Sequence, residues 1–300
     1  MSEERPTTTW LERLIDAVFQ PNVLLVLSCV VAVAVFLPRA TRLLPDLNGG
    51  DQYRLSSSQI EITPPPDWVP QNLAEQVIRN AQLPDELMLL DSTIVSRVAE
   101  AFQRHPWIKG KVRIRTSIPA RMIVDVEYRE PVALVQTKGG SFPIDGDAVV
   151  LPSRDFSPAD VKSYPVVEGI SSLPQGAAGT AWQDPGVLGA ARLAVYLKPF
   201  WKQFGFLSIK SGSSPSSKAA WDELSFQLST VGGSRVIWGR PPESRHPGEL
   251  PAEKKLERIK FYLRHHGPFD SSHGPHEFDI THWRDISRKP IAGNETTSRR

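Results

Sequence analysis

The sequence predicts an α+β protein with three parts. These are a single N-terminal transmembrane helix, a small module in the order β-α-α-β-β, and a mixed α/β domain rich in antiparallel strands. Three observations carry this prediction. Residues 111–129 alternate between polar and apolar side chains, as a half-buried β hairpin requires. Residues 23–37 form an uncharged apolar run, and the remaining chain repeats helix-spaced apolar residues between Pro- and Gly-containing turns.

Composition limits the classes of function. A chain of 300 residues that is 40% apolar can build one large or two small cores. The formal net charge of +2 argues against nucleic-acid binding by bulk charge, so we expect no nucleic-acid partner. The lone cysteine, Cys29, lies in the apolar run, which leaves the rest of the chain without disulfide or thiol chemistry.

The apolar run at 23–37 is the candidate membrane span. As a helix it is roughly 22 Å long, whereas the hydrocarbon core is roughly 30 Å thick, so neighbouring residues must extend it. A signal anchor, a cleaved signal peptide and a buried core helix are the three possible interpretations, and we favour the anchor. We then expect a cytoplasmic segment over 1–20, the span over 21–38 and a linker over 39–58. Arginines flank the run equally on both sides, so charge alone does not orient it.

The next part, 59–136, reads as strand, helix, helix, strand, strand. A short strand at 59–63 precedes a helix at 71–81, and a second helix runs from a cap at 91–93 to about Phe102. The alternating hairpin follows, with its turn across Ile118-Pro119-Ala120.

The part from 137 to 284 reads as a mixed α/β domain. A hairpin at 142–150 and a strand at 164–169 come first, and the tail at 285–300 is expected to be disordered. Between them we expect helices at 186–198 and 251–267 and strands at 223–228, 235–238 and 277–280.

Several short motifs resemble the FtsQ/DivIB family of bacterial cell-division proteins. A Pro-containing turn at Pro119 leads into a strand that contains Val124 and Val126. Further matching residues lie at the strand exit, in a following hairpin and in the last helix: Arg129, Glu130, Pro131, Val132, Ala133, Asp145, Gly146, Lys255 and Leu256. The resemblance covers roughly residues 20–285. It implies a POTRA-like domain at 59–136 and an FtsQ-like β-domain at 137–284.

The resemblance also implies a function. The protein would be a non-catalytic, membrane-anchored scaffold of septum assembly, held in the cell inner membrane by a single pass, with its large C-terminal part periplasmic or otherwise extracytoplasmic. Its partners would be the membrane, small coiled-coil division proteins and septal wall synthase components. A partner strand would add to the last strand of the sheet, which we expect as an exposed edge formed by Phe278, Asp279, Ile280, Thr281 and His282.

Two departures from the family pattern concern this edge. The segment 241–251 is longer than the usual short link, so it reads as an insertion. The family closes its sheet with Asp-hydrophobic-Arg-Tyr, whereas this chain has Asp279-Ile280-Thr281-His282. The Arg and the Tyr are missing, which leaves the identity of the partner open.

The hairpin also carries a basic face. We expect a charge-complementary protein contact or a plain solvated surface there, with Asp125 and Glu127 on the neighbouring strand as partial neutralisers. The face is formed by Lys111, Arg113, Arg115 and Arg121.

No constellation predicts catalysis, a cofactor, a metal or a small-molecule substrate. The histidines between 265 and 282 match no common zinc spacing, and Asp145-Gly146-Asp147 reads as a turn and lacks the further ligands of a calcium loop. Two alternatives to the scaffold stay open. One is a POTRA-type envelope protein-export or chaperone-like module, and the other is a metal-dependent enzyme that uses the histidine loop.

Overall fold

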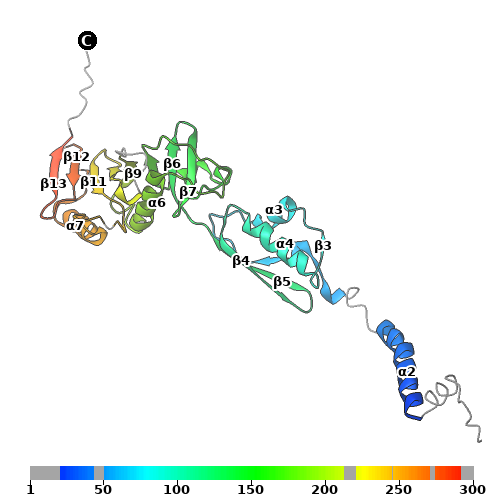
Figure 1. The fold of residues 1–300 in the computed structure, drawn as a ribbon. Helices are drawn as coiled ribbons and strands as arrows, with labels where there is room; N and C mark the ends of the chain where they lie inside the picture. Colours follow the sequence, from blue (N-terminus) through cyan, green and yellow to red (C-terminus); the bar gives the residue numbers. More distant parts are fainter. Residues whose placement is uncertain (1–20, 44–50, 213–220, 245, 271–273, 292–300) are drawn as a thin grey trace, which may run out of the picture. The chain divides into compact units, whose positions relative to one another are not determined.

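The computed structural model describes residues 21–43, 51–212, 221–244, 246–270 and 274–291. The chain divides into two compact units, Met1–Arg54 and Leu55–Arg300. Helix α2, Pro21–Leu43, belongs to the first unit (Figure 1). The expected cytoplasmic segment at 1–20 and most of the expected tail, 292–300, lie outside the described residues.

Helix α2 is not a membrane span. Throughout the described ranges, no helix combines the length and the apolar character that crossing a bilayer requires. The predictions of a transmembrane helix at 21–38 and of a single-pass inner-membrane location with an extracytoplasmic C-terminal part are therefore wrong. The apolar run alone gives roughly 22 Å of helix against a hydrocarbon core of roughly 30 Å, and the rest of the 23-residue helix includes Pro38, Arg39 and Arg42.

The second unit begins with two helices and a three-stranded sheet in the order β2-β5-β4. Helix α4 starts at Ser92 because the carboxylate of Asp91 caps it and accepts a hydrogen bond from the Thr93 amide at 2.8 Å. Figure 1 shows α4 beside β4. The elements of this part are β2 (Glu61–Ile62), α3 (Leu73–Asn80), α4 (Ser92–Gln103), β4 (Ile108–Ser117) and β5 (Arg121–Tyr128), with an additional pair of short strands, β1 (Arg54–Ser56) and β3 (Glu86–Met88).

The alternating sequence forms the β4–β5 hairpin in an unbroken register from Arg113↔Asp125 to Ser117↔Arg121. The register is irregular between Lys109 and Arg113, where Gly110 has a positive φ of 68°. Such a bulge needs a residue that tolerates this conformation, which glycine does. The inner face of the sheet packs onto the two helices through a core that includes Val98, Phe102, Trp107, Met122 and Val124.

The remaining strands form one eight-stranded sheet in the order β13-β12-β11-β10-β9-β8-β6-β7. Four neighbouring pairs are antiparallel, whereas β6–β8, β8–β9 and β11–β12 are parallel. The strands are β6 (Pro131–Thr137), β7 (Gly140–Asp145), β8 (Val166–Glu168), β9 (Phe206–Ser211), β10 (Phe226–Thr230), β11 (Arg235–Gly239), β12 (His276–Asp279) and β13 (Ser287–Pro290).

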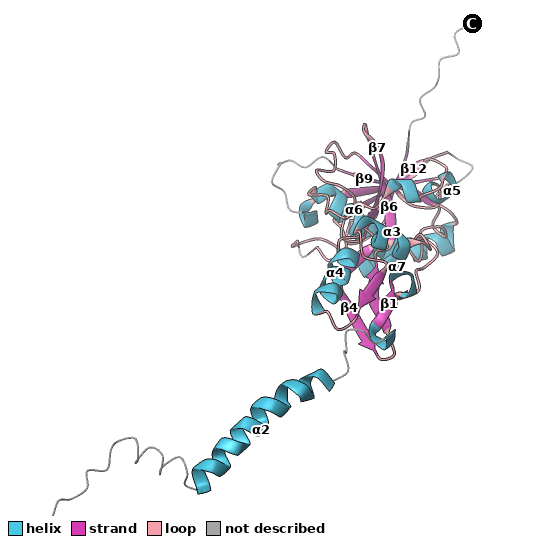
Figure 2. Cartoon of the chain, turned by 90° about the vertical axis from the view of Figure 1, so that its right-hand side faces the viewer, coloured by secondary structure: helices cyan, strands magenta, loops and turns pink. Residues whose placement is uncertain are grey.

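Two long helices pack on this sheet, α6 (Pro185–Leu197) and α7 (Ala252–His266) (Figure 2). Asp184 caps α6, and its carboxylate accepts a hydrogen bond from the Gly186 amide at 2.7 Å. One face of α6 is wholly buried, through Val187, Ala190, Ala191, Leu193, Ala194 and Leu197. Short helical turns complete the unit: η3 (Ser57–Gln59), η4 (Ser153–Asp155), α5 (Pro158–Val161) and η5 (Trp221–Glu223). A further short turn, η2 (Asp51–Tyr53), lies at the end of the first unit.

Three expectations about organisation need correction. The boundary at 136 cuts through β6, which pairs with β7 and β8 and so belongs to the eight-stranded sheet. The expected linker at 39–58 is partly structured, because α2 extends to Leu43 and short elements begin at Asp51. The tail expected at 285–300 contains strand β13, and strand β9 was not expected at all.

Candidate partner-binding site

The expected edge strand is not an edge. β12 lies between β11, which pairs with it in parallel, and β13, which pairs with it antiparallel from His276↔Pro290 to Asp279↔Ser287. The prediction that residues 278–282 form an exposed edge is therefore wrong. The edge is covered because the backbone of Ser287–Pro290 pairs with it. The polar sequence of these four residues did not indicate a strand.

Two of the expected contact residues belong to the core. Phe278 and Ile280 are fully buried, so neither presents its side chain to a partner. Phe278 packs against rings from α7 and the loop after it, with centroid distances of 5.0 Å to Tyr262 and 4.9 Å to Phe269. These residues anchor the strand in the sheet.

The other three expected residues form a polar turn after β12. The carboxylate of Asp279 accepts hydrogen bonds from the Thr281 amide at 2.9 Å and from the Thr281 hydroxyl at 2.6 Å. His282 Nε2 lies 3.2 Å from the same carboxylate, and its side chain is 64% exposed. Of the five residues, His282 is thus the one that offers most of its surface to a partner.

Arg258 of α7 holds this turn in place. Its guanidinium donates to the backbone carbonyl of Ile280 at 3.4 Å and also to the carbonyls of His282 and Trp283. Trp283 Nε1 in turn donates to the carbonyl of Gly248 at 3.1 Å. The turn is therefore fixed from two sides, by a helix and by the 241–251 segment.

β13 is the outermost strand at this end of the sheet and is only four residues long. None of its side chains is buried. Arg288 Nη2 lies 2.9 Å from the Nε2 of His276, and Lys289 stands opposite Glu277 in the register. Pro290 has no N–H to donate. Backbone pairing and polar contacts, rather than apolar burial, therefore hold β13 on the sheet.

A groove of about 1030 Å³ lies beside this strand, between α7 and residues 283–288. Two aromatic side chains on its walls are unusually exposed, Phe261 at 54% and Trp283 at 64%. Charged side chains of both signs surround them, with basic ones in the majority. This end of the unit thus combines a weakly held edge strand with an amphipathic groove.

Two of the motif residues in the first half of the chain, Arg129 and Asp145, contact each other. Arg129, just after β5, donates from Nη1 to Oδ2 of Asp145 at 2.7 Å, and both side chains are largely buried. Asp145 also accepts hydrogen bonds from the amides of Asp147 at 2.9 Å and Val149 at 2.8 Å. Asp145 is therefore both a turn residue, as expected, and a buried ion-pair partner, which the sequence did not indicate.

The remaining motif residues of this region have structural roles. Val132 and Ala133 are buried in β6, which begins at Pro131. Glu130 forms an ion pair with Lys198 at the end of α6. Gly146 lies so close to α6 that an added Cβ would stand 3.0 Å from a methyl group of Val195.

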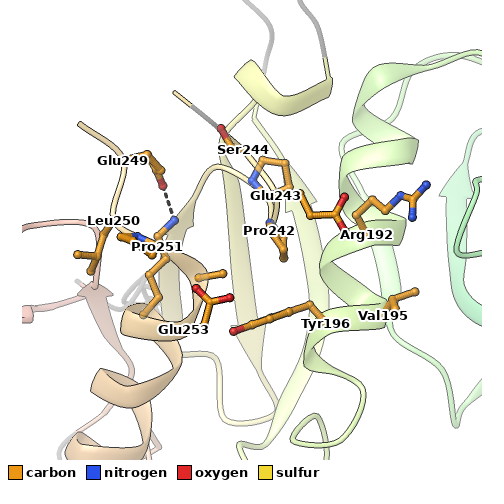
Figure 3. Close-up of a pocket in the computed structure, with 13 residues that line it drawn as sticks. Arg192, Val195, Tyr196, Pro242, Glu243, Ser244, Glu249, Leu250, Pro251 and Glu253 are labelled. Atoms are coloured by element: carbon orange, nitrogen blue, oxygen red, sulfur yellow. Dashed lines mark hydrogen bonds and ion pairs between the residues drawn. The ribbon is translucent and has the colours of Figure 1, made fainter. Parts of the chain in front are cut away.

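Lys255, the motif residue of α7, is almost completely buried. Its ammonium group contacts the carboxylate of Glu249, shown as a dashed line in Figure 3, and lies 3.3 Å from the carbonyl of Arg240 and 5.3 Å from the Trp238 ring centroid. Burial lowers the pKa of Lys255, and the hydrogen bond that its ammonium group donates to Glu249 opposes this shift. Leu256 beside it packs partly buried against the core.

The 241–251 segment, which reads as an insertion in the sequence, supplies Glu249. The segment forms one side of a pocket of about 720 Å³, and residues of α6 and α7 form the rest (Figure 3). Sequence reasoning left this segment without a role. Its anionic residue carries no local motif, and only the fold brings it to Lys255.

Two of the four residues of the expected basic face are neutralised by ion pairs. Arg115 makes two hydrogen bonds to Asp125, at 2.8 and 3.0 Å, and Arg121 makes two to Glu61, at 2.8 and 2.7 Å. Lys111 and Arg113 are exposed, and in the described part of the chain neither makes an ion pair. The free positive charge of this face is thus confined to two residues on β4.

The histidine loop does not assemble a metal site within the described residues, where no group of three or more His, Cys, Asp or Glu side chains lies close enough to hold an ion. His265 stacks on Phe261, and His276 contacts Arg288. His273 lies outside the described residues. In comparisons with known proteins, the chain matches no family model and no curated protein sequence.

Proposed function

We propose that this chain is a non-catalytic scaffold of cell division that acts by binding other proteins, and that a partner strand takes the place of β13 beside β12. One observation carries the proposal: the outer side of β12 is covered only by a short strand that buries none of its side chains. A partner that replaces β13 recovers the same backbone hydrogen bonds and can add apolar contacts of its own.

Replacement of β13 is favoured over extension beyond it. The outer strand carries Arg288, Lys289 and Pro290, and charged residues and proline are what natural edges use to discourage further pairing. β12, in contrast, is anchored by Phe278 at the core and needs no rearrangement to accept a different neighbour. The groove beside α7, with the exposed Phe261 and Trp283, would hold the apolar residues of the partner next to the strand.

The cell-division assignment rests on the motif resemblance, and the packing is consistent with it. Arg129 and Asp145 come from different motifs and form one buried pair, and Lys255 of a third motif is buried under the sheet. Residues that a shared fold requires are expected to pack in this way.

The test is site-specific photo-crosslinking in the native host from position 282, whose side chain is well exposed. Three forms are compared: the full chain, a form ending at Ile286, and a form in which Glu277→Cys and Lys289→Cys, directly opposite in the register, lock β13 by a disulfide. The locked form also carries Cys29→Ser. A probe at Leu207 on β9, which is 51% exposed, is the positional control.

We expect the capture of a division protein from position 282 to increase in the truncated form and to fall in the locked form, with no change at position 207. Equal capture in all three forms would overturn the replacement of β13. Normal septation after depletion of the chain, or capture of many unrelated unfolded envelope proteins, would overturn the cell-division scaffold and favour the export alternative.

A further inference from the structure

The three-stranded sheet of the second unit has its own open edge, on β4. β4 is the last strand in the order β2-β5-β4, and in the described part of the chain it pairs only with β5. An edge strand leaves alternate N–H and C=O groups without strand partners on its outer side. This edge is ten residues long, against four for β13, and it contains no proline.

The bulge divides this edge into two parts. Between Lys109 and Arg113 the register is irregular, so the backbone there is poorly shaped for a further strand. From Arg113 to Ser117 every residue pairs in sequence with β5. At roughly 3.4 Å per residue, this regular stretch is about 17 Å long, which suits an added strand of ordinary length.

The unpaired charges of β4 determine which side chains an added strand should have. Lys109 is paired with Asp147 at 2.9 Å, and Arg115 is paired with Asp125 at 2.8 Å. Lys111 and Arg113 are the exposed cations of β4 that make no ion pair to another described residue. Their charges remain available to an incoming group.

A second copy of this chain does not fit the edge. If two β4 strands paired antiparallel with Lys111 opposite Arg113, the uncompensated cations of both copies would come together, and like charges across a strand pair are destabilising. A segment that carries carboxylates would meet these two residues with the opposite sign. The exposed Ile118, which follows β4 and is 65% accessible, adds an apolar contact at the end of the strand.

We propose that the outer edge of β4 from Arg113 to Ser117 is a docking site for an extended protein segment with carboxylates at alternate positions, which adds to the sheet as a fourth strand. Lys111 and Arg113 pair with its carboxylates, and the backbone of β4 supplies the hydrogen bonds. The site lies on a different sheet from β12, so it does not depend on the function proposed above.

The test is fluorescence anisotropy of the full-length protein with three short labelled peptides. The first alternates glutamate with valine, the second alternates lysine with valine, and the third is the acidic peptide with alternate backbone nitrogens methylated. We expect only the first to bind. The methylated peptide keeps the charge but loses strand hydrogen bonding, so equal binding of the first and third would overturn strand addition.

Two double variants locate the site. Lys111→Glu with Arg113→Glu should weaken binding of the acidic peptide roughly tenfold or more. Lys138→Glu with Lys210→Glu changes the net charge equally at exposed positions away from β4, in the β6–β7 turn and on β9, and should leave binding within about twofold. An equal loss in both variants, or no binding of the acidic peptide to the unmodified protein, would overturn the proposal.

Hydrogen exchange gives an independent readout. With the acidic peptide bound, amides of residues 113–117 should exchange more slowly, whereas those of β12 and β13 should not change. Protection that appears only at β12 and β13 would place the peptide at the other edge and contradict the assignment to β4.

Discussion

Arg129 and Asp145 form a buried ion pair, 2.7 Å between Nη1 and Oδ2, that joins the end of β5 to the end of β7. The guanidinium is 16% exposed and the carboxylate 3%. Removal of one member of such a pair leaves a buried charge without compensation. The loss of either member should therefore destabilise the protein more than the loss of one member of an exposed ion pair.

The first prediction concerns this pair. Arg129→Ala should lower the free energy of unfolding by roughly 3 kcal/mol or more, because Asp145 would stay buried without its cation. Arg115→Ala removes an exposed pair of similar geometry, with side chains 68% and 39% accessible, and should cost less than about 1 kcal/mol. Urea unfolding monitored by tryptophan fluorescence measures both. Equal losses would show that burial does not set the strength of the Arg129 pair.

The second prediction concerns pH. Burial lowers the pKa of Lys255 in the folded state below its ordinary value of 10.5. The unfolded chain then holds this proton at pH values where the folded chain has released it. The Lys255 contribution to stability therefore rises as the pH passes through the lowered pKa toward 10.5 and is constant below that window.

The measurement is the difference in unfolding free energy between the native sequence and Lys255→Met, followed from pH 7 to 10.5, since other titrating groups then cancel. We expect this difference to shift in favour of the native sequence at the alkaline end. Lys254→Met, which removes an exposed lysine one residue away, is the matched control for the loss of a positive charge from this helix. A flat difference for Lys255→Met would contradict the cause given for the shift.

The third prediction concerns Gly239, at the end of β11. Its φ is +80°, and an added Cβ would stand 2.8 Å from the Glu249 carboxylate and 2.9 Å from Thr281. Gly239→Ala should therefore lower the free energy of unfolding by the roughly 1–2 kcal/mol that a left-handed backbone costs a residue with a Cβ. Displacement of Glu249 should lower it further. Gly248→Ala, at φ +86° with open space around it, isolates the backbone cost alone. If thermal unfolding shows the same loss of stability for both variants, the contact with Glu249 does not contribute to the cost of Gly239→Ala.

The fourth prediction concerns the strength of β13. Because none of its side chains is buried, it should open locally without global unfolding. Native-state hydrogen exchange should show the amides of residues 287–289 exchanging much faster than those of Leu228 in β10 and Val236 in β11, both fully buried. Exchange of β13 at the rate of the core strands would mean that it is an integral part of the sheet and would weaken the proposed replacement.

Sequence patterns predicted the elements whose signal is local. The alternation of polar and apolar residues predicted the β4–β5 hairpin. The Asp91 cap, with Ile94, Val98 and Phe102 on one face, predicted α4. The hydrophobic run at 23–37 is also a local signal, but its interpretation as a span depended on extension by neighbouring residues. The described helix does extend beyond the run, to Leu43, but through Pro38, Arg39 and Arg42, and it does not combine the length and apolar character that a span requires.

The candidate site was harder to predict because its parts depend on pairing between distant residues. Ser287–Pro290 forms a strand through its backbone, and backbone pairing imposes no apolar alternation on an outer strand. The polar contacts of Arg258 with the turn after β12 also join residues that are distant in the sequence, so no local pattern indicates them. The sequence pattern predicted a strand at 277–280, which the structure has as β12, but not the neighbour that covers it.

The contact between Glu249 and Lys255 has a consequence for shortening the chain. A chain with a shorter link in place of 241–251 loses the Glu249 carboxylate and must offer the buried ammonium group another acceptor. The segment reads in the sequence as a separable addition, whereas in the fold it completes the surroundings of a motif residue.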